Sequence, residues 1–154
     1  MRNGHRTVLE AVDGLAPPHW QTPGVCGEWT VKDLIAHLAS FEWVLAETLD
    51  DLVNGGTATP TLDRFLKGPA SFNDAEVAKR RDDSVGEVIA EYKNAYEEVM
   101  ALAERVQAGT WTQNGILPWY GEAYDLDDFI AYAFYGHKQE HCAQIAAFRD
   151  RQEE

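Results

Sequence analysis

Apolar residues recur at helical spacing in four stretches of the chain, and polar residues occupy the positions between them. No stretch alternates between apolar and polar residues with the period of two that is typical of strands. Pro17-Pro18 ends the first stretch, Asn54-Gly55-Gly56 ends the second, and Gly109 ends the third. The four stretches cover residues 8–15, 34–52, 85–106 and 129–148. This pattern predicts an all-α protein that folds as a four-helix bundle.

Three of the predicted helices begin with a capping box, in which two side chains bond each other's backbone amides across the first turn. The pairs are Thr30 with Asp33, Ser84 with Glu87, and Asp125 with Asp128. Trp29 and Leu34 stand at the positions of a hydrophobic staple around the first pair. We therefore expect helices to begin directly after residues 30, 84 and 125.

The longest connection covers residues 55–83 and contains several prolines and glycines. Asn73 and Glu76 have the spacing of another cap, which predicts one short helix over residues 77–81. A connection of this length can carry the chain back across the bundle, so the second and third long helices can run parallel. No internal repeat is visible, and we predict a single domain over residues 1–154.

The chain is strongly acidic, with 13 Lys and Arg against 26 Asp and Glu and a formal net charge of −13. Nucleic acid and anionic membrane surfaces would repel such a protein, so we expect neither as a partner. The longest apolar run, residues 129–135, is far shorter than the roughly 20 residues of a membrane-spanning helix. The two cysteines, Cys26 and Cys142, form neither a disulfide framework nor a zinc ribbon. Free thiols suit a reducing compartment, so we expect a cytoplasmic protein.

The histidines carry the clearest chemical signal. His137 and His141 are four residues apart, which corresponds to about 400° of helix rotation and about 6 Å of rise. Their imidazoles should therefore project side by side from the apolar face of the fourth helix. His37 lies on the core-facing side of the second helix, between Leu34 and Phe41. Packed helices lie about 8–10 Å apart, so His37 can complete a site that the pair begins.

Three imidazoles leave a coordination position open for water or substrate, as a catalytic metal site requires. Nitrogen ligands suit a divalent transition metal, with zinc or nickel favoured, rather than magnesium or calcium. The competing interpretation is that these are ordinary core histidines, each satisfied by a hydrogen bond. Residues 137–141 also match the inverted zinc-protease pattern His-x-x-Glu-His, whose third ligand lies far downstream. Only 13 residues follow His141 here, so we do not expect peptidase activity.

At these positions the sequence resembles the DinB superfamily of four-helix-bundle metalloproteins. The resemblance rests on residues 27–38, GEWTVKDLIAHL, and on residues 135–145, YGHKQEHCAQI. The second segment is most similar to the branch named for colibactin self-protection and related resistance proteins. The resemblance implies an up-down-down-up bundle, a homodimer, and a divalent metal on His37, His137 and His141. Characterised members include thiol-dependent transferases and isomerases, and hydrolases that inactivate reactive small molecules.

Three side chains near the histidines are candidates for further roles. Glu140 precedes His141 directly and is a candidate general base for metal-bound water, the alternative being a solvated glutamate at the helix edge. Gln144 follows His141 by one turn, and Ser40 follows His37 by three residues. Both are therefore candidate residues of a substrate pocket.

An aromatic loop over residues 111–124 leads into the helix that carries the histidine pair. Trp119 and Tyr120 in this loop are candidates for the pocket wall. The alternative is that these rings only cover one end of the bundle.

Two further features are expected to be structural. Cys142 points about 100° away from His141, which favours a small buried packing residue. Lys79-Arg80-Arg81 is followed at once by Asp82-Asp83, which favours a solvated helix end. The alternative for this basic cluster is a site for an anionic thiol cofactor.

Three functions are compatible with the sequence. The first is a metal-dependent enzyme that acts on a reactive small molecule, either by hydrolysis or, as the alternative that the resemblance implies, by thiol-dependent transfer or isomerisation. The second is a non-catalytic protein that binds a metal or a small molecule. The third is an interaction module whose histidines are purely structural. The sequence favours hydrolysis or sequestration slightly, because it offers little positive charge for an anionic thiol.

Overall fold

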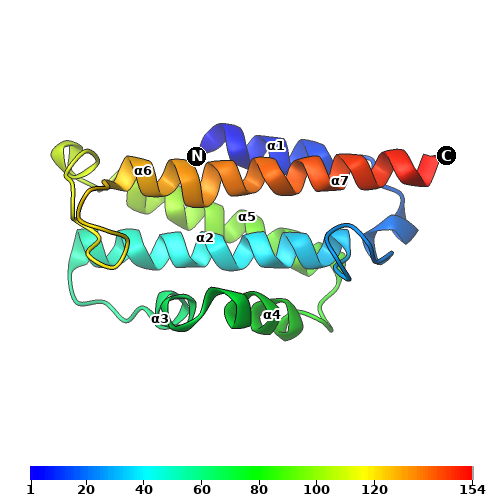
Figure 1. Ribbon diagram of the computed structural model, residues 1–154, viewed down its shortest axis with the longest axis horizontal. Coiled ribbons are helices and arrows are strands. Elements are labelled where there is room, and N and C mark those ends of the chain that lie inside the picture. Colours follow the sequence, from blue (N-terminus) through cyan, green and yellow to red (C-terminus); the bar gives the residue numbers. More distant parts are fainter. Residues whose placement is uncertain (154) are drawn as a thin grey trace. The chain divides into compact units, whose positions relative to one another are not determined.

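Every regular element in residues 1–153, which the computed structural model describes, is a helix (Figure 1). This confirms the predicted all-α class. The longer helices are α1 (Arg2–Val12), α2 (Val31–Asn54), α5 (Val85–Ala103) and α7 (His137–Glu153). The chain divides into two compact units, one formed by Leu15–Arg105 and the other by Met1–Gly14 with the chain from Val106 onward. No described helix has the length and apolar character needed to cross a membrane.

The unit formed by Leu15–Arg105 is built on α2 and α5, which pack along their lengths and run in the same direction (Figure 1). At one end, Lys32 in the first turn of α2 donates to the carbonyl of Asp83, just before α5 begins (2.8 Å). At the other end, Arg105 donates to the side chain of Asn54, where α2 finishes (2.7 Å). The parallel arrangement predicted for the second and third long helices is therefore confirmed.

The predicted capping boxes at Thr30, Ser84 and Asp125 are all present, each with both reciprocal hydrogen bonds. α2 ends at Asn54 as predicted, and Gly55 after it adopts a positive φ of 71°. This conformation is strained for residues with a Cβ, so the glycine stops the helix cleanly. α1 and α5 end earlier than the apolar pattern predicted, which leaves Leu15 and Val106 outside both helices.

The connection between α2 and α5 differs from the prediction, because it holds two helices rather than one. α3 (Pro60–Lys67) and α4 (Pro69–Lys79) each begin with a proline. Proline suits this position, since its fixed φ matches a helix and its missing N–H is not needed there. The proposed cap at Asn73 and Glu76 is wrong, because both residues lie inside α4.

The solvated helix end predicted for the basic cluster is also wrong for its central residue. Arg80 is 4% exposed and forms a bidentate pair with Glu91 on α5, with distances of 2.7 and 2.6 Å. Its remaining terminal nitrogen donates to Glu76 (2.9 Å), which also accepts from Arg64 on α3 (2.8 Å). The cluster therefore ties α3, α4 and α5 together, and Arg80 is committed to carboxylates of its own chain.

In the other unit, α1 packs against α7 and runs in the same direction. Near the start of both helices, Gly4 lies so close to Lys138 that an added Cβ would come within 3.2 Å of that side chain. Near the end, Arg149 donates to the carbonyl of Ala11 (3.1 Å). The glycine thus leaves room on α1 for the close approach of the buried Lys138 side chain.

The helix predicted after Asp125 is continuous but not uniform. It starts as α6 (Leu126–Ile130), passes through a π-helical segment, η3 (Ala131–Gly136), and continues as α7. A π segment accommodates an extra residue per turn and occurs often at functional sites. Here it ends directly before His137, so it sets the rotation at which the histidine pair leaves the helix.

Candidate metal centre

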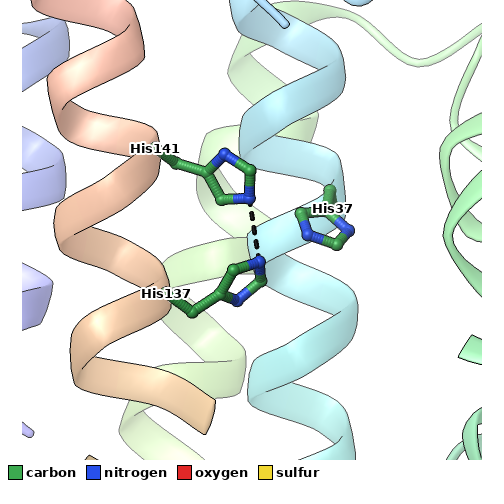
Figure 2. Close-up of side chains that lie close together, drawn as sticks. All are labelled: His37, His137 and His141. Carbon is green, nitrogen blue, oxygen red and sulfur yellow. Dashed lines mark hydrogen bonds between the residues drawn. The ribbon is translucent and has the colours of Figure 1, made fainter. Parts of the chain in front are cut away.

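His137 and His141 occupy the first two turns of α7, and their rings project from the same side of the helix (Figure 2). The ring centroids are 4.5 Å apart, and the two Nε2 atoms are separated by 2.8 Å. The predicted side-by-side arrangement of the two imidazoles is therefore confirmed. Because the two Nε2 atoms face each other, one ion near both of them could be bound by both rings.

Gln144 fixes the orientation of His141. Its Oε1 lies 2.8 Å from Nδ1 of His141, and an amide oxygen can only accept a hydrogen bond. Nδ1 of His141 therefore carries the hydrogen, and Nε2 of the neutral ring presents a lone pair toward His137. Metal-binding histidines commonly have their second nitrogen held in this way. Gln144 thus acts on the ring of His141, and its expected place in a pocket wall stays a prediction.

Both imidazoles of the pair favour the neutral form. Burial lowers the pKa of His137 to about 3, with further contributions from His141 and Lys138. Burial also lowers the pKa of His141, although the hydrogen bond that its Nδ1–H donates to Gln144 and the charge of Glu140 oppose this shift. Neutral imidazoles have the lone pairs that metal coordination requires, so the pair is in the right state near pH 7.

The geometry of the pair fits a transition-metal ion. Two nitrogens bound to tetrahedral zinc at about 2.0–2.1 Å are separated by about 3.3 Å. The Nε2 atoms of His137 and His141 are 2.8 Å apart, so small ring rotations would open the pair to that spacing. Two imidazoles suit zinc, nickel, copper or iron better than calcium or magnesium.

His37 lies in the second turn of α2 and is 2% exposed. Its ring contacts two aromatic side chains of the same unit. The centroid of Trp29 lies 5.1 Å from the centroid of His37, and that of Phe41 lies 4.7 Å from it. These contacts restrict the rotation of the imidazole, so His37 is presented in one orientation.

His37 belongs to the unit formed by Leu15–Arg105, whereas His137 and His141 belong to the other unit. These are the three histidines that the sequence pattern selected. A donor set of three imidazoles alone would leave a position for water or substrate on a four-coordinate ion.

The other predicted site residues on the long helices have varied surroundings. Ser40 is fully buried, and its hydroxyl donates to the carbonyl of His37 within α2 (2.6 Å). The hydroxyl of Ser40 is therefore satisfied by the backbone of its own helix. Glu140 is exposed on α7, where its charge acts on the pKa of His141. Cys142 is buried, and burial raises the pKa of its thiol to about 11, in agreement with its predicted packing role.

Trp119 and Tyr120 gather around the beginning of α6. Their centroids lie 5.2 and 4.8 Å from that of Phe129, which in turn contacts Phe134 in the π segment (5.1 Å). The loop rings thus cover the residues that precede His137 along the chain. Burial and the charge of Asp128 raise the pKa of Tyr120.

Two residues that sequence reasoning left unassigned belong to the surroundings of His37. Trp29 was given only a staple role, and Phe41 only a place in the apolar stripe. Phe41 lies one turn after His37, so the helical spacing contained the signal for that contact. Trp29 lies before α2 begins, and its position depends on the short turn in which its N–H bonds the carbonyl of Cys26 (3.0 Å).

Comparison with known families places this geometry in context. Residues 1–126 match the family model described as the mycothiol maleylpyruvate isomerase N-terminal domain. The chain belongs to this family. The domain is DinB-like, so the predicted superfamily is confirmed, whereas the narrower resemblance to the resistance branch stays a prediction. The matched residues include His37 and end before His137 and His141. No curated protein and no solved structure gives a match.

Proposed function

We propose that this protein is a metal-dependent enzyme that joins a low-molecular-weight thiol to a reactive small molecule, or isomerises the molecule through that thiol. His37, His137 and His141 are the proposed metal ligands, and the metal is a divalent transition ion such as zinc or nickel. The observation that carries the proposal is the histidine pair, whose ring orientation Gln144 fixes, in a member of a family named for a thiol-dependent isomerase.

The chemistry follows from the donor set. When bound, a divalent ion on three neutral imidazoles supplies Lewis acidity and favours the thiolate form of a sulfur ligand. The chain's own part is to hold the rings. Gln144 keeps the hydrogen of His141 on Nδ1, and Trp29 and Phe41 hold the ring of His37. Cys142 stays protonated and buried, so the reacting thiol comes from solution.

Thiol chemistry is favoured over hydrolysis for two reasons. The family name describes a reaction with mycothiol, and Glu140, the candidate base for hydrolysis, is exposed. The thiol should itself carry little negative charge, because Arg80 is committed to Glu76 and Glu91 and the chain has a net charge of −13. Mycothiol should therefore serve better than glutathione.

The test is a turnover assay with zinc-loaded protein, mycothiol and 1-chloro-2,4-dinitrobenzene. A sulfur–carbon bond forms, chloride leaves, and the thiol proton passes to solvent. Maleylpyruvate with mycothiol provides the matching isomerisation assay. We expect many turnovers per chain, loss of activity on chelation, and loss in His141→Ala. Consumption of a single equivalent would instead indicate a binding protein, and an equal rate in His141→Ala would reject the proposed centre.

Hydrolysis is the second candidate, because Glu140 acts electrostatically on His141. If Glu140 serves as a base, Glu140→Gln lowers turnover of a reactive ester or amide at least tenfold in the absence of thiol, while zinc affinity is retained. An unchanged rate in Glu140→Gln would remove this candidate. Glu97→Gln, an exposed glutamate on α5, is the matched control.

A further inference from the structure

The helices α3 and α4 line a cavity that contains none of the proposed metal ligands. Its volume is about 300 Å³, at the lower end of the range typical of small-molecule sites. The lining residues are Arg64, Lys67, Ser71, Phe72, Ala75 and Glu76. Phe72 and Ala75 form the apolar side of this lining, and Arg64, Lys67 and Glu76 form its charged side.

The apolar side of the cavity is connected to His37 by a row of rings. Phe72, which is 3% exposed, lies 6.1 Å from Phe41 between centroids, and Phe41 lies 4.7 Å from His37. Phe65 on α3 contacts both Phe72 and Phe41, with centroid distances of 5.5 Å to each. A row of packed rings thus connects the wall of the cavity with the imidazole of His37, entirely within the unit formed by Leu15–Arg105.

The charged side of the cavity favours an anion. Glu76 is neutralised, because it pairs with Arg64 (2.8 Å) and with Arg80 (2.9 Å) and lies 3.7 Å from Lys79. Arg64 is in turn committed to Glu76 and to the carbonyl of Pro60. Lys67 lines the cavity from the end of α3 and forms no ion pair with the residues described. It is the cation that the cavity offers to a ligand.

We propose that this cavity is a binding site for a small organic acid with an apolar body. The carboxylate of the ligand meets Lys67, and its body lies against Phe72 and Ala75. The further step, that such an acid is the substrate of the enzyme, rests on the proposed function. The binding itself requires neither the metal nor the thiol.

Binding is tested with benzoate on metal-free protein, followed by amide chemical shifts in two-dimensional NMR. We expect benzoate to shift the amides of Ser71 and Ala75 and to bind more tightly than the uncharged benzamide. Because Lys67 is exposed, the contrast should be about fivefold and should shrink at high salt. Equal binding of benzoate and benzamide, or shifts spread over the whole chain, would overturn the proposal.

Two pairs of variants locate the site without disturbing the core. Ala75→Leu fills the cavity and should abolish benzoate binding, whereas Ala78→Leu, at another exposed position of α4, should leave binding unchanged. Lys67→Gln should weaken binding about fivefold, and Lys93→Gln on α5 should not. Loss in both members of either pair would place benzoate elsewhere and reject the site.

A kinetic arm tests the substrate class. In the zinc-loaded protein with mycothiol, Ala75→Leu should raise KM for 4-chloro-3-nitrobenzoate at least tenfold and leave KM for its amide unchanged. If benzoate binds but KM does not change, the assignment of substrate class is overturned while the site stands. If no thiol-dependent turnover occurs but the binding results hold, the proposed function fails and the acid-binding site does not.

Discussion

One group of buried polar side chains surrounds Arg80 at the end of α4, and another includes the histidine pair on α7. In the first, the cation is enclosed by carboxylates. Burial opposes ionisation of Glu76, yet the hydrogen bonds from Arg80 and Arg64 outweigh it, so the pKa of Glu76 lies below its ordinary value. In the second, burial and the neighbouring ring lower the pKa of His137 to about 3.

The difference separates a structural cluster from a candidate site. Around Arg80, opposite charges and hydrogen bonds match, so the cluster needs nothing from outside. In the histidine pair, two neutral rings share one hydrogen bond, in which Nε2 of His141 accepts from Nε2 of His137, and no opposite charge is enclosed. An ion between them would instead take a lone pair from each ring. The predictions below test this contrast, beginning with the largest expected effect.

Replacing Arg80 by Met should destabilise the protein by about 3 kcal/mol, because Glu76 is left in the interior without its main cation. The value is at the lower end for a buried pair, since the side chain of Glu91 is 29% exposed. Urea unfolding measures the change. Arg81→Met, at the exposed neighbouring position, should change stability by less than about 0.5 kcal/mol. A small effect of Arg80→Met would show that the cluster is not structural.

Replacing His141 by Ala should reduce zinc affinity by more than about 100-fold, beyond the loss typical of residues that only support ligands. The metal-free variant should lose less stability than Arg80→Met, because no buried charge is left without its partner. Calorimetric titration and urea unfolding give the two values. Strong destabilisation with unchanged zinc affinity would make the pair structural.

Gln144→Ala should weaken zinc binding about 10- to 100-fold, since His141 loses the acceptor that holds its Nδ1–H. Gln144→Glu should restore most of the affinity, because a carboxylate also accepts this hydrogen bond. Gln139→Ala on the same helix serves as the control and should have no effect. Equal losses in the Ala and Glu variants would argue against an orienting role.

The two clusters should also differ in the pH range over which they affect stability. An unfolded histidine has a pKa of about 6.5, and that of folded His137 is about 3. Protonation therefore favours the unfolded chain below pH 6.5, and the metal-free protein should lose about 1 kcal/mol of stability between pH 7 and 5.5. Glu76 and Glu91 have lowered folded pKa values, so their contribution is lost only below about pH 4.5.

Urea unfolding at several pH values in the presence of a chelator measures this difference. The loss between pH 7 and 5.5 should become smaller in His137→Ala, where only the lowered pKa of His141 still contributes, and should persist in full in Glu76→Gln. If Glu76→Gln removed that loss instead, the loss of stability in this pH range could not be assigned to the histidines.

The smallest effect is expected for Cys142→Ala, which should leave zinc affinity within about twofold of the parent. The thiol of Cys142 has a pKa of about 11 and is buried beside the pair, so it offers no thiolate to an ion. Calorimetric titration provides the comparison. A loss of tenfold or more would add Cys142 to the ligand set.

Local chemistry explains which features could be predicted from the sequence. A capping box needs only residues three positions apart, so the helix starts after Thr30, Ser84 and Asp125 could be read directly. The pairing of His137 with His141 likewise follows from helical spacing. The starts of the helices at Pro60 and Pro69 could also have been predicted, because proline is common at the first helical position. The prediction instead placed both prolines in the connection between the long helices.

Other features depend on contacts between distant residues. Arg80 looked solvated because Asp82 and Asp83 follow it, whereas its partner Glu91 lies 11 residues away on another helix. Nothing in the sequence marked the π segment before His137, which changes the helix only through backbone bonding. Gln144 was placed in a pocket wall, and only the geometry shows that its amide reaches Nδ1 of His141.

The central claim is that three histidines hold one divalent ion, and elemental analysis of the untagged protein tests it most directly. After incubation with zinc or nickel and removal of the excess, the account predicts about one ion per chain in the parent. It predicts loss of that ion in His37→Ala as well as in His137→Ala, with helical content retained. A parent protein that takes up neither metal, or a His37→Ala variant that keeps its full complement, would contradict the three-histidine centre.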